Sequence, residues 1–232
     1  METQTMLADQ LHASLLDAAD RHNAAQALVW LEACRRLTAE APEPAACRRL
    51  FSVANRQLAA LTLLPKAAIK ALQAQRVLAA EAWSPGDAGR ALLLLRALAA
   101  GAGPALAFDL YQGGDSLEQQ AVVKALILLP KPEDWLALAT DASRSHVAGV
   151  FQALACDNAY PAQQFPELNF NQLVLKALFT GAPARHIAGL EQRWSPELEH
   201  MVAAYASERR AAGRSVSDDV VFLLQGLHHE NV

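Results

Sequence analysis

The sequence is short of β-branched residues, and this shortage narrows the fold class. Valine and isoleucine together occur 16 times among 232 residues, against 49 alanines and 37 leucines. Because β-branched residues favour strands, whereas alanine and leucine are the strongest helix formers, this composition predicts an all-α protein. A chain of this length can bury roughly 70% of the surface that its unfolded form exposes, so we expect a substantial core.

Cysteines, apolar runs and basic charge are also scarce. The odd and widely spaced Cys34, Cys47 and Cys156 predict free thiols in a cytoplasmic protein rather than a disulfide framework. No window reaches the 18 or so uncharged apolar residues of a membrane span, since the longest candidate, 91–100, contains Arg96. The first ten residues do not resemble a secretory signal. A net charge of −4 and a pI of about 6.0 predict no nucleic-acid partner.

The common catalytic and metal-binding motifs are missing from the sequence. It contains no GxGxxG, GxxxxGK[ST], HExxH, CxxC or GxSxG pattern. The seven histidines are dispersed, and although His186 and His200 could meet Glu191 or Glu197 in space, no ligand spacing supports that grouping. We therefore predict no metal and no cofactor.

Hydrophobic spacing and capping signals predict a succession of helices. The segment through 92–98 is apolar almost all round and should lie centrally. Ser116 and Gln119 match a capping box, and prolines predict a break over 39–44. The expected helices cover residues 2–20, 24–39, 65–82, 105–112, 117–129, 141–155, 169–180, 184–192, 196–212 and 217–227, with others around 47–58, through 92–98 and from 131–134 through 138.

The order of these elements suggests a repetitive architecture. The tetrapeptide LLPK occurs at 63–66 and again at 128–131, each time between predicted helices, and the connections are short. We therefore predict antiparallel helix hairpins stacked into a solenoid-like α-α superhelix. The chain would form one domain over 1–232, with a helical scaffold over 1–155 and a motif-bearing part over 156–226.

The segment 156–168 is the most distinctive loop of the sequence. Two prolines should make it stiff and extended, and such a loop on a helical scaffold commonly carries binding groups. It contributes Asn158, Tyr160, Phe165 and Glu167 as candidate ligand-binding or partner-binding residues. A structural alternative has Tyr160 and Phe165 filling a gap between helices while Asn158 caps a neighbouring element.

Two predicted helices after this loop carry polar stripes. Asn169, Gln172 and Lys176 fall on one stripe opposite an apolar one, which fits a solvated face. Lysine also shifts its pKa readily when buried, so Lys176 is a candidate for chemistry. On the 196–212 helix, Tyr205, Glu208 and Arg209 lie within one turn of each other. That cluster suits either a structural hydrogen-bond network or a site for an anionic ligand.

The second half of the chain resembles the EboA family. The match covers about 60 residues and rests on an N-x-Y-P-A stretch, an F-x-E pair, a run N-Q-x-V-L-K-A-L-F, a G-x-P, a G-L pair and a Y-A-x-E-R-x-A-A-G-R-x-V segment. The residues that carry it are Asn158, Tyr160, Pro161, Ala162, Phe165, Glu167, Asn171 through Phe179, Gly181, Pro183, Gly189, Leu190 and Tyr205 through Val216. Ala159 departs from the family pattern, which often has proline there and so a more rigid loop.

The resemblance implies a role but no catalytic residues. Similar proteins are encoded in bacterial gene clusters for secondary metabolites, beside prenyltransferase-like, TatD-like hydrolase, sugar-isomerase-like and dehydroquinate-synthase-like proteins, and are linked to moving precursors toward the periplasm. The positions that match the family motif are candidates for binding: Asn158, Tyr160, Asn171, Gln172, Lys176, Tyr205, Glu208 and Arg209.

Three hypotheses follow from these observations. The first is a non-enzymatic accessory protein that binds a metabolite or a partner protein of such a pathway. The second is a small-molecule enzyme with Lys176 or Glu208 as base and Arg209 holding an anionic group, which requires those side chains to converge on a pocket. The third is a purely structural scaffold, in which the same groups would be paired with the backbone.

Overall fold

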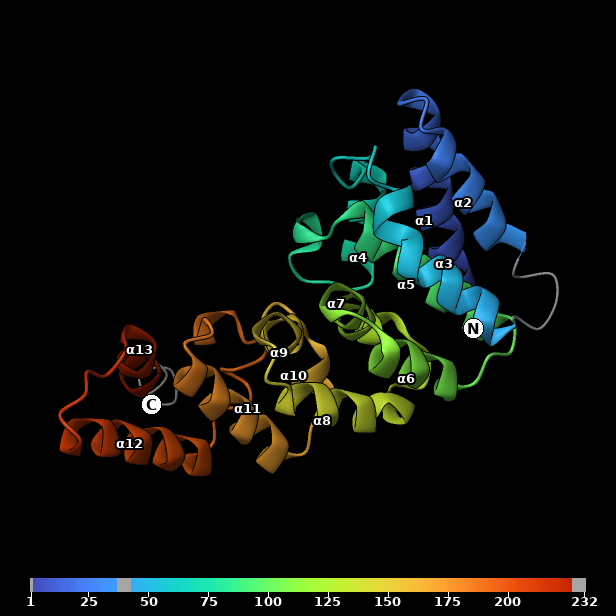
Figure 1. Cartoon of the computed structure of the whole chain (residues 1–232). Helices are drawn as coiled ribbons and strands as arrows, with labels where there is room; N and C mark the ends of the chain where they lie inside the picture. The colour runs from blue at the N-terminus through green and yellow to red at the C-terminus, as the bar shows by residue number, and fades with distance from the viewer. Residues whose placement is uncertain (1, 37–42, 227–232) are drawn as a thin grey trace. The chain divides into compact units, whose positions relative to one another are not determined.

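The computed structural model describes residues 2–36 and 43–226, and the regular secondary structure in these ranges is helical, with no strand (Figure 1). The α-helices are α1 (Glu2–Arg21), α2 (Ala25–Arg36), α3 (Pro44–Gln57), α4 (Lys66–Ala74), α5 (Pro85–Ala99), α6 (Pro104–Gly113), α7 (Ser116–Ala125), α8 (Leu136–Arg144), α9 (Ala148–Ala155), α10 (Tyr160–Gln164), α11 (Glu167–Thr180), α12 (Pro196–Ala211) and α13 (Asp218–Gly226). Short 3₁₀ helices are η1 (Ala80–Ala82), η2 (Leu126–Leu128), η3 (Pro132–Trp135) and η4 (Ala184–His186). The prediction of an all-α protein is confirmed.

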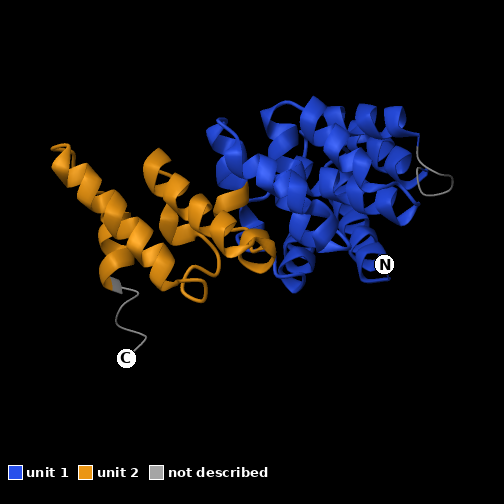
Figure 2. Cartoon of the chain, turned by 90° about the horizontal axis from the view of Figure 1, so that it is seen from below, with its two compact units in different colours: residues 1–153 blue, residues 154–232 orange. Residues whose placement is uncertain are grey.

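The chain divides into two compact units, which Figure 2 shows in different colours. The N-terminal unit is Met1–Ala153 and the C-terminal unit is Leu154–Val232. The superhelical stacking and the single-domain organisation stay predictions. The predicted break over 39–44 lies largely outside the described residues, as does the end of the last predicted helix.

Helix α5 is the core of the N-terminal unit, as its apolar sequence predicted. Ser84 caps it, accepting a hydrogen bond from the backbone N–H of Asp87 at 3.0 Å, and Pro85 occupies the first turn. Every residue from Pro85 to Ala97 is buried, and α5 contacts α1, α2, α3 and α7. A β-carbon on Gly89 would lie 2.5 Å from a methyl carbon of Leu58, so this glycine sets how closely α5 is packed.

Two arginines are buried in α5. The Nε of Arg90 donates to the Phe51 carbonyl at 3.0 Å, and its guanidinium carbon lies 5.3 Å from the centre of the Phe51 ring. Its Nη2 is 3.9 Å from a carboxylate oxygen of Glu118, which is also buried. Arg96 reaches outward, and its Nη2 lies 3.2 Å from Asp9. Burial lowers the pKa of both guanidinium groups, although neither loses its charge near neutral pH.

The predicted helix over 65–82 was too long. Helix α4 ends at Ala74 because Arg76 adopts the left-handed conformation, with φ of 61°. The backbone N–H of Val77 donates to the Leu72 carbonyl at 3.1 Å and that of Arg76 to the Gln73 carbonyl at 2.9 Å. These are the two bonds of a Schellman motif. Glycine usually marks such an end, and here an arginine takes the position.

Three further predictions in the N-terminal unit need correction. The capping box of α7 uses Asp115 and Glu118 rather than Ser116 and Gln119. The predicted helix over 141–155 is interrupted, because Ser145 is extended and its hydroxyl accepts from the backbone N–H of Val147 at 3.1 Å. Val147 thus precedes α9 and is exposed, not part of the core. The LLPK segments also differ: the lysine of the first begins α4, whereas the lysine of the second is left-handed.

The C-terminal unit contains α10 to α13, and its connections differ from those predicted. The segment 156–168 is not an extended loop, because it contains α10, and α11 begins at Glu167, two residues earlier than predicted. Gly181 is left-handed behind α11, as expected for a helix end. Over 184–192 only the single turn η4 is helical, and Gly189 has φ of 68°. Helix α12 contacts both α11 and α13.

Candidate functional site

Three of the four predicted binding residues of the 156–168 segment are buried in the C-terminal unit. The Asn158 side chain is buried, and its Oδ1 accepts from the backbone N–H of Tyr160 at 3.0 Å, an Asx turn that leads into α10. Tyr160 is fully buried and Phe165 is buried beside the end of α10. Glu167 is exposed in the first turn of α11. This arrangement agrees with the structural alternative for Asn158, Tyr160 and Phe165.

Arg193 holds this segment in place and was not identified from the sequence. One Nη donates to the Ala162 carbonyl at 2.7 Å and the other to the Phe165 carbonyl at 2.9 Å. The guanidinium carbon also lies 4.7 Å from the centre of the Phe170 ring on α11. The fork of arginine donors therefore closes the end of α10 while its flat face covers the start of α11. We name this set of contacts the Arg193 clamp.

Other motif residues serve the same packing. Gly189 is left-handed, and a β-carbon there would lie 2.7 Å from the Ala162 methyl carbon, so two backbone segments approach closely. On the other side of η4, Asp219 of α13 accepts from the backbone N–H of Ala184 at 2.8 Å and from Arg185 Nε at 2.9 Å. The glycine and the small alanine of the motif are thus explained by contact geometry.

The candidates on α11 fall in different environments. Asn171 is buried, and its Oδ1 has no hydrogen-bond partner within the described part of the chain. Gln172 is exposed. Lys176 is half-buried, and burial lowers the pKa of its ammonium group, as a charge loses hydration in an apolar setting. Of these three residues, Lys176 is thus partly buried and has a shifted pKa, as its candidacy for chemistry required.

The α12 candidates bond largely to the backbone. The Tyr205 hydroxyl donates to the Leu178 carbonyl of α11 at 3.4 Å. Arg209 donates from Nε and Nη2 to the Ser215 carbonyl at 3.1 and 2.9 Å, which secures the turn after α12. Glu208 is exposed. Tyr205 thus links α12 to α11, and Arg209 caps its own segment.

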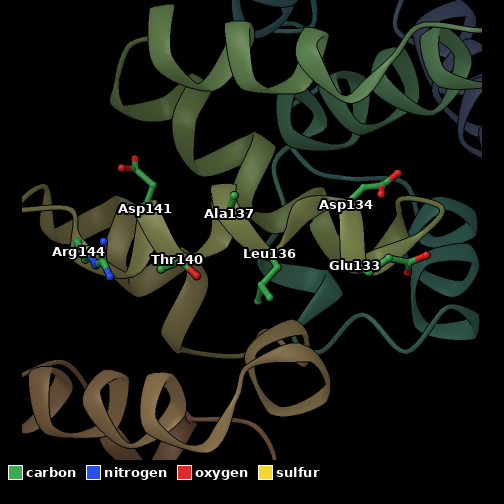
Figure 3. A pocket seen from close by; sticks show the side chains of 7 residues that line it. All are labelled: Glu133, Asp134, Leu136, Ala137, Thr140, Asp141 and Arg144. Carbon is green, nitrogen blue, oxygen red and sulfur yellow. The ribbon is translucent and has the colours of Figure 1, made fainter.

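A wide hollow lies in the N-terminal unit, on η3 and α8 (Figure 3). Its volume is about 590 Å³ and it is widely open to solvent. Figure 3 shows the lining side chains, which are mostly polar or charged: Glu133, Asp134, Leu136, Ala137, Thr140, Asp141 and Arg144. Behind it, burial and the Asp141 carboxylate raise the pKa of Tyr111 to about 12. The polar lining and wide opening are typical of a solvated helix surface.

A smaller and more enclosed pocket lies at the C-terminal end of α5. Its volume is about 190 Å³, and most of its lining is apolar. We call it the α5-end pocket, and its lining residues are Gln4, Leu95, Leu98, Ala99, Pro104, Pro130, Lys131, Asp134 and Trp135. None of the residues that were predicted from the sequence to bind a ligand or partner lines either hollow. The pocket's walls come from four separate stretches of the unit, a grouping that no local sequence pattern reveals.

Comparison with known proteins gives one family and no close relative of known structure. A family model described as "Metabolite traffic protein EboA" matches residues 10–225. No curated protein and no solved structure matches the chain. Among the helices that the structure describes, none is both long and apolar enough to span a membrane, and no group of three metal-binding side chains occurs in the same residues.

Proposed function

Because the chain belongs to the EboA family, described as metabolite traffic proteins, we propose that it is a non-enzymatic accessory protein that binds a metabolite. It would hold a precursor of a secondary-metabolite pathway for transfer or transport, working from the cytoplasm. This role requires a helical framework with a binding site, and it requires no chemistry on the bound molecule.

The observation that carries this proposal is that several polar side chains of the family motif are hydrogen-bonded to the backbone. Arg209, the predicted anion-binding group, donates two hydrogen bonds to the Ser215 carbonyl. Asn158 and Tyr205 also form hydrogen bonds with backbone groups. A catalytic base or anion holder must lie within hydrogen-bond reach of its substrate. Side chains that already bond to the backbone favour a structural role in the protein over a catalytic one.

The proposal is tested by recovering the bound molecule. The full chain is purified without denaturation from cells that normally produce it, and native mass spectrometry compares its mass with that of the same protein after unfolding and refolding. We expect a mass difference that corresponds to one small molecule, which returns unchanged after incubation with the refolded protein. A natively purified protein with no adduct would contradict metabolite binding, and a chemically altered molecule would contradict the non-enzymatic role.

A partner protein from the same gene cluster is compatible with this role. Enzymes that make or consume the precursor would be the natural donors and acceptors of the bound molecule. Co-purification of the full chain with each neighbouring gene product, at near-physiological salt, measures this directly. If none of them associates, with or without the recovered metabolite, then transfer through a complex is wrong.

One observation keeps the enzymatic alternative as a second candidate. Burial lowers the pKa of Lys176, and a lysine whose pKa is lowered gives up its proton more readily and so becomes a better candidate for a base. If the recovered metabolite is converted by the wild-type protein, Lys176→Met should abolish turnover, whereas the exposed Lys70→Met should not. Turnover that survives Lys176→Met would exclude Lys176 as the base.

A further inference from the structure

We propose that the α5-end pocket is the metabolite site and that it takes an uncharged compound with a compact apolar body and one hydroxyl or amide donor. This inference rests on the proposed function and adds the place and the chemical class of the ligand.

The size of the pocket limits the ligand. Its volume of about 190 Å³ lies below the range of roughly 300 to 1,000 Å³ that is usual for drug-sized ligands. An engineered apolar cavity of about 150 Å³ binds benzene. The pocket therefore fits a single ring or a short branched chain, or the corresponding end of a longer molecule whose remainder lies outside.

The walls are apolar and already fixed. Leu95 and Trp135 are almost fully buried, and the Trp135 indole N–H donates to the Pro130 carbonyl at 2.7 Å. That bond satisfies the only polar atom of the indole, so the ring presents an apolar surface. Pro104 and Pro130 add two rigid rings to the lining. A pocket with such preformed walls loses little conformational freedom when a ligand enters.

One polar atom of the lining is unsatisfied. The side-chain oxygen of Gln4 is buried and has no hydrogen-bond partner among the described residues. A buried acceptor without a donor is unfavourable, so most such groups in proteins are paired. A hydroxyl or amide N–H on the ligand would supply the missing donor, and a hydrocarbon would not.

The charges at the rim favour a neutral ligand. Lys131 and Asp134 are both exposed at the pocket, and they contribute one positive and one negative charge. Lys131 adopts a left-handed conformation with φ of 52°, which is uncommon for a residue other than glycine and which shapes the turn between Pro130 and η3. With opposite charges beside each other, neither an anion nor a cation gains a net attraction.

The test uses three probes of equal ring size: benzyl alcohol, toluene and benzoate. Binding to the full chain is followed by NMR through the indole N–H signal of Trp135, which is assigned by its loss in Trp135→Phe. We expect benzyl alcohol to shift this signal with an affinity about tenfold higher than that of toluene, the usual effect of one hydrogen bond. Benzoate should bind more weakly than benzyl alcohol.

Matched variants locate the site. Gln4→Met removes the acceptor and should lower the affinity for benzyl alcohol to that for toluene, whereas Gln10→Met, at an exposed position of the same helix, should not. Leu98→Trp fills the pocket and should abolish binding, whereas Leu63→Trp, at a position that is 81% exposed, should not. If Leu98→Trp does not fold by circular dichroism, Ala99→Leu at the mouth of the pocket replaces it.

Three results would overturn the inference. The first is unchanged benzyl alcohol binding in the folded pocket-filling variant, which would place the probe elsewhere. The second is equal affinity for benzyl alcohol and toluene, which would remove the role of Gln4. The proposed function fails separately, through the absence of a co-purified metabolite. A metabolite that co-purifies equally with wild type and with Leu98→Trp would leave the function standing and refute this site.

Discussion

Replacing Arg193 with methionine should loosen the 158–166 segment and leave the rest of the chain unchanged. Methionine keeps much of the apolar stem of arginine and removes the guanidinium group. The carbonyls of Ala162 and Phe165 then lose their donors, and the Phe170 ring loses its cover. If the motif segment is a structural element, its stability must depend on this clamp.

The magnitude follows from the contacts. Each hydrogen bond from a charged group contributes about 1.5 to 3 kcal/mol, and the lower figure applies because these bonds are only partly buried. A partly exposed cation–π contact adds about 0.5 to 1 kcal/mol. The expected loss is therefore about 3.5 to 4 kcal/mol, or roughly a 400- to 800-fold increase in the population of the open segment. Arg193→Lys cannot form the fork and should lose about half as much.

Hydrogen exchange measured by mass spectrometry is the suitable assay, because it resolves local opening. The amides of Gln163 and Phe165 bond to the carbonyls of Ala159 and Pro161 at 3.2 and 3.0 Å, so they report on α10. In Arg193→Met these amides should exchange roughly 400- to 800-fold faster. Arg210→Met, at an exposed position of α12, serves as control and should change their exchange less than twofold.

Unchanged protection of α10 in Arg193→Met would refute the reasoning. It would mean that the buried side chains of Tyr160 and Phe165 hold the segment without help. A uniform loss of protection over the whole C-terminal unit would give a different correction, because it would show that α10 opens only together with α11 and α12.

Three further predictions follow from other contacts. Gly189→Ala should lower the free energy of unfolding, measured in urea, by about 2 kcal/mol or more, because the position has a left-handed φ of 68° and a β-carbon there would lie 2.7 Å from Ala162. Gly103→Ala, where a β-carbon would have no atom within 4 Å, serves as control and should change this free energy little. Arg90→Met should lower the free energy of unfolding by about 3 kcal/mol, because the buried Glu118 carboxylate loses the positive charge beside it. Adding Glu118→Gln should recover part of that loss, and equal stability of the single and double variants would contradict the pairing. Burial raises the pKa of Cys156 to about 11, so iodoacetamide should alkylate it about 100-fold more slowly than free cysteine at pH 8, with the rate rising up to about pH 11. Since this thiol pKa is raised on folding, its contribution to stability should be complete below about pH 8.5 and be lost as the pH rises through 11, and a flat pH profile of alkylation would refute the shift.

The sequence predicted the helices whose signals are local. Ser84 and Pro85 mark the start of α5, and the leucines after them predict its central place. The end of α4 was missed because Arg76 occupies a left-handed position that sequence patterns assign to glycine. Likewise the break before α9 depends on the Ser145 hydroxyl, which competes with a helical pattern that is otherwise continuous.

The roles of the polar residues were less accessible. A helix predicted to be central must bury its charges, so the burial of Arg90 and Arg96 could have been inferred. Their partners could not, since the acceptor for Arg90 is the Phe51 carbonyl, 39 residues away. Arg209 was predicted as a ligand-binding group from its neighbours on one helix face, whereas its bonds go to the Ser215 carbonyl in the turn beyond α12.

The Arg193 clamp also has a consequence for protein synthesis. Arg193 follows Ala162 by 31 residues, so the ribosome completes the 158–166 segment well before it adds the arginine. At bacterial and eukaryotic elongation rates of about 5 to 20 residues per second, this delay is roughly 2 to 6 s. During that interval the nascent chain carries two apolar aromatic residues, Tyr160 and Phe165, without the group that later secures them.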